Sequence, residues 1–518
     1  MNSLVIVESG AKATKIKGYL EANFNDQNWQ VEACLGHIRD LPDEESAVNP
    51  ENWSDLKWKE TPKGKKTIKA LRKVCKDIDN LYLATDPDRE GEAIAWHLHS
   101  DFEEKNLLEN VDVKRITFTE ITSSAIKNAI ENPRTIDQDL VDAYLTRRIL
   151  DHLIGFKVSP LLWRHISRAK SAGRVQSPTL RIICEKEDER DAHVAKEFWP
   201  LKATFVFEES KFDADLVSMS DRNLAKQPLN GEEEVNLVMN ELDDSSFLLA
   251  DVETKPQSSS PKPPFRTSTL QMAASSSLSF TADRTMNAAQ KLYEGGLITY
   301  LRTDGISIST SPNTGEPFSE ENPGPPPLNE IRNLISSKFG DAYLSEKVRV
   351  YKAKVQNSQE AHEAIRPTDI SKHPDQVALN GDEERLYKLI WNRTVASQMV
   401  NSKYERKTLT IESSDNKYTF KASSRKNVFL GFETLTKEGE ETEFQFSDNL
   451  VNGINLELDS KDAEQKFTTP PNRFSEASLI KRMEEEGIGR PSTYATIVKA
   501  LRTKKYTYGT KSIAPSDL

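Results

Sequence analysis

The stretch Leu81-Tyr-Leu-Ala-Thr-Asp86-Pro-Asp88-Arg-Glu90-Gly-Glu92 carries the strongest fold signal in this chain of 518 residues. Its first four residues are apolar and predict a buried strand, and a helix is predicted to start near Glu90. Asp86, Asp88 and Glu90 alternate along the turn between them. Such an oxygen-rich set suits Mg²⁺, which takes one or two carboxylates and keeps several waters. Acids at a helix N-terminus are a structural alternative for Glu90, but they do not account for Asp86 and Asp88.

A second acidic position follows the first apolar run of the chain. Leu4-Val-Ile-Val7 predicts a buried parallel strand, and residues 11–24 predict the next helix. Glu8 stands at the carboxyl end of the strand, and Lys12 stands in the first turn of the helix. Because open α/β sheets place their chemistry at this edge, Glu8 and Lys12 are candidates to face a phosphate. A glutamate that caps the helix explains Glu8 equally well.

The octet Leu297-Ile-Thr-Tyr300-Leu-Arg302-Thr-Asp304 follows two glycines and is predicted to form a strand. Alternation along a strand puts Tyr300 and Arg302 on one face. A phenol can form a covalent phosphoester, and a guanidinium beside it can bind the phosphate oxygens. A half-buried strand with a solvated arginine is the alternative, and the octet alone favours that alternative.

Taken together, the motifs resemble those of a known family. Val7-Glu8-Ser9 and residues 85–92 resemble the Toprim domain of topoisomerases, some primases and some nucleases, and they are most similar to type IA DNA topoisomerases. Further motifs of that family follow in the same order: Ser171-Ala-Gly-Arg-Val-Gln-Ser-Pro178, Phe265-Arg-Thr-Ser-Thr-Leu-Gln271, Gly296–Asp304, His362-Glu-Ala-Ile-Arg-Pro-Thr368, Arg473-Phe-Ser-Glu-Ala-Ser-Leu479 and Gly487-Ile-Gly-Arg-Pro-Ser-Thr493. The chain departs from the family pattern at Gly305, where serine is usual, and Ser307 or Ser309 is a candidate substitute.

The resemblance implies a site, with Tyr300 as the nucleophile. The implied catalytic residues are Tyr300, Arg302, Glu8, Lys12 and His362. The implied ligands of Mg²⁺ are Glu8, Asp86, Asp88 and Glu90. The implied DNA-binding residues are Arg115, Arg147, Arg148, Asp151, Ser171, Gly173, Arg174, Gln176, Ser177, Arg490, Ser492 and Thr493.

The implied fold is a multidomain α/β plus α+β toroid. It combines a Toprim α/β domain, a helical groove domain, a β-rich arch and a winged-helix-like catalytic tyrosine domain. The expected boundaries are 1–145 for Toprim with a basic insertion at about 40–76, 146–196 for the groove, 197–260 for the arch, 261–384 for the tyrosine domain, 385–471 for the second part of the arch and 472–518 for an incomplete second part of the groove. We expect a stiff boundary at 256–264 and an exposed, proline-rich insertion at 311–327.

The implied function is that of a type IA topoisomerase, an isomerase that relaxes negatively supercoiled DNA without ATP. It would cleave one strand through a 5′-phosphotyrosine, pass a strand and rejoin the ends. A fragment that only binds or cleaves single-stranded DNA, and a Toprim primase or nuclease, are the alternatives. Expected partners are single-stranded and negatively supercoiled DNA, with no nucleotide cofactor and no membrane. The protein is expected to be monomeric, cytoplasmic and associated with the nucleoid.

Composition sets broad limits. The net charge of −11 argues weakly against nucleic acid, but residues 57–76 hold nine Lys or Arg against one acid, and residues 145–181 hold eight against one. The three cysteines are isolated, which predicts neither a disulfide framework nor a structural zinc site. The mean hydropathy of −0.63 and the lack of a long apolar run predict no membrane span.

The last residues carry one more expectation. Family members continue beyond the position that corresponds to Leu518 and often add zinc ribbons, so the chain resembles a C-terminally truncated core. Side chains that further helices would cover are then expected to lack that cover. They are Leu479, Met483, Ile497, Val498 and Leu501.

Overall fold

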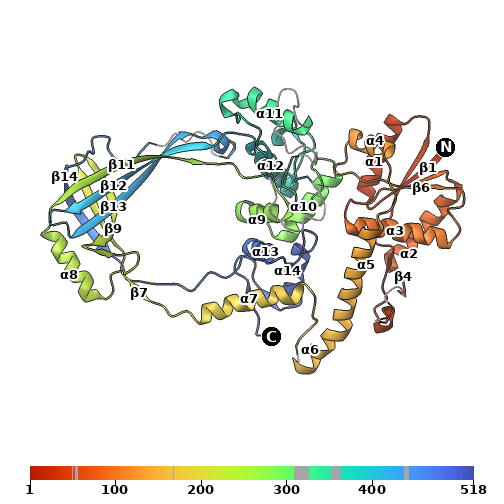
Figure 1. The fold of residues 1–518 in the computed structure, drawn as a ribbon, viewed down its shortest axis with the longest axis horizontal. Coiled ribbons are helices and arrows are strands. Elements are labelled where there is room, and N and C mark those ends of the chain that lie inside the picture. Colours follow the sequence, from red (N-terminus) through yellow and green to blue (C-terminus); the bar gives the residue numbers. More distant parts are fainter. Residues whose placement is uncertain are drawn as a thin grey trace.

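The computed structural model describes residues 1–49, 51–52, 56–166, 168–308, 326–351, 363–436 and 443–517. Its ribbon closes into a ring, with an antiparallel sheet on one side and helical and α/β units on the other (Figure 1). None of the described helices combines the length and the apolar character that crossing a bilayer requires.

The N-terminal unit is a parallel four-stranded sheet in the order β2-β1-β5-β6. Its strands are β1 (Asn2–Val7), β2 (Asn28–Ala33), β5 (Asn80–Leu83) and β6 (Asp112–Arg115). Its helices are α1 (Gly10–Asn23), α2 (Pro62–Val74), α3 (Arg89–Glu104) and α4 (Ser123–Glu131). The predicted strands and helix starts in this unit are confirmed. Ile6 lies opposite Leu83, so the carboxyl ends of β1 and β5 meet at one edge.

The apolar runs are continuous because this sheet is buried on both faces. Val5 and Val7 join one core cluster, whereas Leu4 and Ile6 join another on the opposite face. The basic insertion folds as the short pair β3 (Arg39–Asp40) and β4 (Lys59–Glu60), followed by α2.

A helical path leaves this unit. α5 (Gln138–Leu153) continues through a π-helical turn (Ile154–Val158) into α6 (Ser159–His165), and α7 (Gln176–Asp191) returns toward the ring. In Figure 1, α5 runs from α3 to α6, which lies at the lower edge of the molecule. The amphipathic pattern of residues 141–156 predicts a helix, which is confirmed as far as Leu153. Pro178 is a favoured first helical residue and predicts a helix start there, but α7 starts two residues earlier.

The arch is a seven-stranded sheet in the order β10-β9-β13-β12-β11-β14-β8. Its strands are β8 (Leu201–Phe207), β9 (Ser210–Met219), β10 (Arg222–Asn223), β11 (Phe247–Ser259), β12 (Ser402–Ser413), β13 (Tyr418–Phe429) and β14 (Asn455–Ala463). The expected antiparallel strands are confirmed, but the segment also contains the unforeseen helix α8 (Glu232–Asp243). The boundary predicted at 256–264 is wrong at its start, because Pro256 lies within β11 opposite Glu405.

The tyrosine domain contains α9 (Thr267–Leu278), α10 (Ala282–Glu294), α11 (Pro326–Phe339) and α12 (Gly381–Ala396). The residue pattern predicts two helices, over 267–277 and 281–294, and α9 and α10 confirm them. The expectation that strands resume at 385 is wrong, since those residues lie in α12, which buries Leu386, Ile390 and Trp391 in the core that it shares with α9 and α10. The expected insertion at 311–327 lies almost entirely outside the described residues.

The strand predicted over 297–304 is also wrong. Ile298 forms only an isolated bridge with Pro367. The amide of Thr299 donates to the Arg366 carbonyl at 2.9 Å, whereas the amide of Tyr300 donates to the Thr119 carbonyl at 2.7 Å. The segment is therefore shared between two different neighbours, and no continuous ladder forms.

The C-terminal segment packs on α7. It contains α13 (Glu476–Glu485), α14 (Tyr494–Thr503), β16 (Thr507–Tyr508) and β17 (Ala514–Pro515). The prediction that its apolar side chains lack cover is wrong: Leu479, Met483, Val498 and Leu501 are buried in one cluster with residues of α7 and with Tyr506, and Ile497 is half-buried. Pro491 predicts the start of a helix there, but α14 starts at Tyr494 instead.

Candidate active site

The adjacent ends of β1 and β5 bring three predicted residues together. The Glu8 carboxylate accepts a hydrogen bond from the Asp86 amide at 3.0 Å. Lys12 Nζ donates to Asp86 and lies 3.7 Å from the Glu8 carboxylate. Because Lys12 is only 1% exposed, its ammonium depends on these two acids to offset the loss of water.

Glu8 can hold a proton near neutral pH. Burial first, and then the charge of Asp86, raise the pKa of Glu8 to about 8, while Lys12 opposes the shift. A carboxylic acid in this state can donate a proton to a leaving oxygen.

Asp88 organises the start of α3 and faces the tyrosine domain. One of its carboxylate oxygens accepts from the Gly91 amide at 2.8 Å, which caps the helix. Gly91 is required there, because a Cβ would lie 2.1 Å from the Asp86 carbonyl oxygen. The other Asp88 oxygen accepts from the Tyr300 hydroxyl at 2.5 Å.

Arg302 reaches the same acids. Its Nη1 lies 3.5 Å from Asp88 and 3.4 Å from Glu90. Burial raises the pKa of Asp88, but Arg302 and the bonds from Tyr300 and Gly91 outweigh that effect and lower it overall. The predicted convergence of Tyr300 and Arg302 on one site therefore holds, although the segment that carries them is not a strand.

Several contacts fix the Tyr300 segment against the N-terminal unit. Gly296 has a φ of +63°, and a Cβ there would lie 2.5 Å from the Ile121 carbonyl oxygen, so glycine is needed on both counts. The Tyr300 ring packs edge-on against Tyr293 with centroids 5.3 Å apart. Tyr300 is 2% exposed, and burial together with Asp88 raises its pKa well above the usual value. The arrangement is closed, so the two units together shield the phenol from solvent.

The predicted metal ligands are present but are engaged by protein groups. Asp86 is paired with Lys12, Asp88 with Tyr300 and Arg302, and Glu90 with Arg302. Within the described ranges, no three His, Cys, Asp or Glu side chains are grouped so that they could hold a metal ion. The oxygen donors suit Mg²⁺ in their chemistry. The expected four-residue cluster with Glu8 is not assembled in this closed arrangement.

A line of charges leads away from the site along α5. Arg147 lies 3.6 Å from Glu90 and 3.8 Å from Asp151, and Arg174 lies 3.2 Å from Asp151. We call Glu90, Arg147, Asp151 and Arg174 the charge path. Each of its side chains is about one-third exposed, so the path connects the site to the 171–178 loop while remaining open to solvent.

Three predicted DNA-binding residues are buried and bonded to other protein groups. Arg115 is 1% exposed, and its guanidinium donates hydrogen bonds to Glu92 and to main-chain carbonyls such as that of Thr85. Gln176 is buried, with its amide oxygen accepting from Lys504 and its nitrogen donating to the Ser171 carbonyl. Thr493 is buried and accepts from the Arg490 amide at 2.8 Å.

The other DNA-binding residues remain predictions. Arg148 pairs with Asp40 at 2.7 Å and is 35% exposed. Those that are exposed or half-exposed near the groove are Ser171, Gly173, Ser177, Arg490 and Ser492. His362 lies outside the described residues.

Arg366 forms a junction between two domains that the sequence does not predict. Arg366 donates to Glu363 at 2.9 Å and to Glu120 at 3.1 Å, which ties the tyrosine domain to the N-terminal unit. Arg366 stands in a motif that was singled out, but its partner Glu120 is 246 residues away and carries no local signal.

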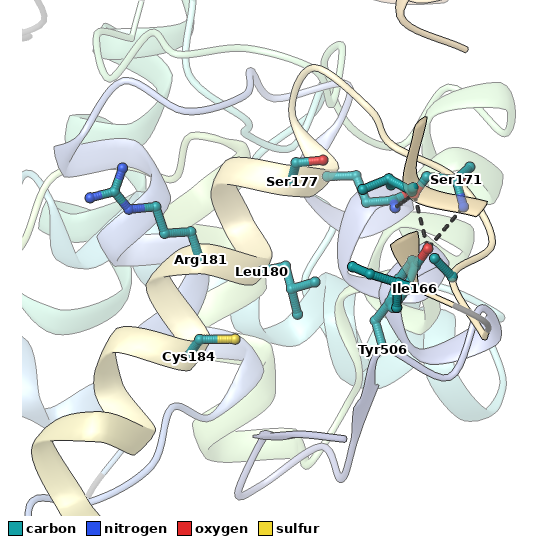
Figure 2. A pocket seen from close by; sticks show the side chains of 10 residues that line it. Ile166, Ser171, Ser177, Leu180, Arg181, Cys184 and Tyr506 are labelled. Atoms are coloured by element: carbon teal, nitrogen blue, oxygen red, sulfur yellow. Dashed lines mark hydrogen bonds between the residues drawn. The ribbon is translucent and has the colours of Figure 1, made fainter. Parts of the chain in front are cut away.

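A cavity of about 310 Å³ lies behind the 171–178 loop (Figure 2). Leu162, Ile166 and Leu180 give it an apolar lining, and Tyr506 closes one side. The Tyr506 hydroxyl accepts from the amides of Lys170 and Ser171 at 2.7 and 2.8 Å, so it holds the start of the loop in place.

This fold and site define a Toprim protein whose acidic edge receives a tyrosine and an arginine from a separate helical domain. A family model described as Toprim domain matches residues 3–121, and one described as DNA topoisomerase matches residues 135–518. Since the second match alone covers most of the chain, the chain belongs to the DNA topoisomerase family. Toprim domains bind divalent metal, typically Mg²⁺.

Individual relatives agree with the family models. The chain is 42% identical over 532 residues to DNA topoisomerase 1 of Rickettsia bellii, covering 99% of this chain and 64% of the relative. It is 41% identical over 512 residues to DNA topoisomerase 1 of Zymomonas mobilis, covering 97% of this chain and 40% of the relative. The chain therefore spans from less than half to about two-thirds of the length of these relatives.

A solved structure agrees as well. Full-length topoisomerase I from Thermotoga maritima superposes with a TM-score of 0.79 at 34% sequence identity, covering 99% of this chain and 80% of that one. The predicted multidomain fold is thereby confirmed.

Proposed function

We propose that this chain performs the reversible strand cleavage of a type IA DNA topoisomerase. Tyr300 attacks a phosphodiester of single-stranded DNA, and the 3′-hydroxyl leaves. The observation that carries the proposal is the 2.5 Å hydrogen bond from the Tyr300 hydroxyl to Asp88, with Arg302 beside both. A nucleophile from one domain and an acidic edge from another thus meet at one point.

The cleavage step forms one bond, breaks one bond and moves two protons. A bond forms between the Tyr300 oxygen and phosphorus, and the bond from phosphorus to the 3′-oxygen breaks. The phenolic proton passes toward Asp88, and Glu8 supplies a proton to the leaving 3′-oxygen. Because the pKa of Tyr300 is raised and that of Asp88 is lowered, the phenol keeps its proton until attack begins. Arg302 stabilises the charge that builds on the phosphate.

Rejoining reverses these steps, so the bond energy stays in the phosphoester and no ATP is needed. We propose Asp86, Asp88 and Glu90 as the residues that would hold Mg²⁺ once DNA has separated the closed contacts. The bound ion would supply positive charge that keeps the cleaved ends in place.

The biological setting follows from family membership. We propose that the substrates are single-stranded and negatively supercoiled DNA, that relaxation of supercoils is the outcome, and that the protein acts as a monomer without a nucleotide cofactor. Association with the nucleoid in the cytoplasm fits this role.

The test uses a labelled single-stranded oligonucleotide and a denaturing gel. Wild-type protein should form a covalent adduct, and Tyr300→Phe should form none, because the ring remains but the attacking oxygen is gone. Tyr293→Phe is the matched control, since it removes a hydroxyl from the neighbouring buried tyrosine, and it should keep the adduct. An adduct that persists in Tyr300→Phe would remove Tyr300 from the role. Free nicks without an adduct would indicate a nuclease, and a mobility shift alone would indicate a binding fragment.

A further inference from the structure

The helix α2 presents a row of lysines to solvent. Its buried positions include Gly64, Ile68 and Leu71, which follow helical spacing, and the two apolar side chains pack in the core of the N-terminal unit. The basic run at 57–76 therefore folds with its apolar side inward and its charge outward. We call the five exposed lysines of the helix the lysine face: Lys63, Lys65, Lys66, Lys69 and Lys73.

The lysine face lacks the acidic neighbours that other helices of this protein have. In α4, Lys127 Nζ lies 3.9 Å from Glu131 one turn later, and α1 and α13 contain lysine–glutamate pairs with the same spacing. In α2, the residue four positions after Lys65 is Lys69, and the residue four positions after that is Lys73. None of the five lysines forms an ion pair with a residue that the structure describes.

This arrangement opposes the stability of the free protein. Like charges one turn apart on a helix repel each other, and Lys63 stands in the first turn, at the positive end of the helix dipole. The one acid of the basic run, Glu60, lies 2.8 Å from Arg72 and so does not neutralise the lysine face. Charges that are kept against such repulsion indicate a partner that supplies negative charge.

The composition of α2 favours duplex nucleic acid as that partner. The helix contains no aromatic residue on which an unpaired base could stack, although stacking supplies much of the affinity for single strands. Interfaces between proteins are depleted in lysine and rely on large apolar anchors, and α2 exposes none. Lys65 and Lys73 are about 12 Å apart along the helix axis, a length over which a duplex carries about seven phosphates.

The sheet of the N-terminal unit separates the lysine face from the cleavage site. Ile68 and Leu71 belong with Leu4 to the core cluster on one face of this sheet. Val5 belongs with Tyr300 to the cluster on the opposite face. In Figure 1, α2 lies beyond α5 as seen from the ring opening. DNA bound to the lysine face is therefore a different segment from the strand that reaches Tyr300.

We propose that the lysine face binds the phosphate backbone of a duplex DNA segment that is not the strand cleaved at Tyr300. This inference rests on the proposed function, which supplies the cleaved strand as the first segment. Lysine ammonium groups act as point charges on phosphates and carry no base readout, so the binding is independent of sequence.

The test measures the binding of a labelled duplex of about 30 base pairs at several salt concentrations, in the Tyr300→Phe background so that cleavage plays no part. Adding Lys65→Gln and Lys69→Gln should reduce the slope of log affinity against log salt by about 1.8, at about 0.9 per phosphate contact, and should weaken binding about tenfold at about 0.1 M salt. Lys17→Gln with Lys127→Gln is the matched control. It removes the same charge from exposed positions of the same unit, but both lysines are paired with glutamates, so the slope should change by less than about 0.3.

Two further measurements separate duplex binding from other roles of the lysines. The α2 double variant should lower the ratio of duplex affinity to single-strand affinity about tenfold, since the lysine face offers no ring for stacking. Its thermal melting temperature should not fall, because the substitutions relieve repulsion between lysines one turn apart.

An unchanged salt slope would overturn the proposal, and with a lower melting temperature it would assign the lysines to the fold. A parallel loss of duplex and single-strand affinity would also overturn it, because the lysine face would then attract any polyanion. A wild-type protein that forms no adduct would contradict the proposed function alone, since the duplex measurement requires no cleavage.

Discussion

The arch and the junction between Toprim and tyrosine domains are both closely packed, for opposite reasons. In the arch, Phe205, Phe247 and Phe420 meet edge to face with ring centroids 5.2–5.9 Å apart, and the core is apolar. At the junction, the buried groups are Lys12, Asp86, Tyr300 and Arg366, which are polar or charged.

The arch is built for stability, whereas the junction is built from groups that chemistry requires. Apolar burial in the arch stabilises the fold directly. Buried charges at the junction each lose hydration, and mutual pairing only offsets that loss. The junction therefore keeps charged groups that a stable core does not need, next to an apolar cluster to which both domains contribute.

Truncation in the arch should give the largest loss of stability. Phe420→Ala removes a fully buried ring between two others and should lower the free energy of unfolding by about 3–5 kcal/mol. Urea denaturation followed through the β-sheet signal measures the loss. A loss below about 1 kcal/mol would show that the arch core repacks, and that apolar burial in the arch stabilises the fold less than we expect.

Removing one charge at the junction should cost somewhat less. Lys12→Met leaves the half-buried Glu8 and the buried Asp86 without their cation and should destabilise the N-terminal unit by about 3 kcal/mol. A triple variant, Lys12→Met with Glu8→Gln and Asp86→Asn, should recover most of that stability in thermal melts yet form no adduct. A triple variant as unstable as the single one would mean that the pairing itself stabilises the fold.

The proton on Glu8 gives the junction a pH dependence that the arch lacks. With a pKa of about 8, Glu8 is protonated at neutral pH, and one pH unit above that value about a tenth of it remains so. Initial adduct formation should therefore fall as pH rises through 8, by about tenfold per unit thereafter. Glu8→Gln cannot donate a proton, so its adduct formation should be slow and nearly flat between pH 6 and 9, a range of about three units around the pKa. A falling profile that survives Glu8→Gln would move the proton donor elsewhere.

The smallest effect is expected on the exposed charge path. Arg174→Ala should weaken single-strand binding without altering base preference and should reduce the slope of log affinity against log salt by about 0.7. Arg222→Ala in the arch, another arginine paired with an acid, is the control and should change neither quantity. A changed base preference would show that Arg174 contacts a base edge.

The sequence predicts those helices and strands whose formation depends on residues that are neighbours in the chain. The apolar runs before Glu8 and Asp86, and the helix starts after them, depend on neighbours in sequence and were predicted. The strand expected around Tyr300 does not exist, because its backbone partners come from Thr119 and Arg366, which no local pattern reveals. The helix α12 was missed although Leu386, Ile390 and Trp391 do repeat at helical spacing.

The same distinction between local and distant causes applies to the residues of the site. Motif resemblance located Tyr300, Arg302 and the acids, because their order in the chain is the signal. It could not show that Arg115 turns inward to Glu92, or that Lys12 and Arg302 occupy the carboxylates where a metal was expected. Both depend on which side chains lie nearest after folding.

We propose that Tyr300 and the Toprim acids form one strand-cleaving site. This proposal is tested most directly by trapping the adduct with a single-stranded oligonucleotide, digesting the protein and identifying the DNA-linked peptide by mass spectrometry. We expect the DNA to be linked to Tyr300 through a 5′-phosphate. A link to another residue, or through a 3′-phosphate, would contradict it.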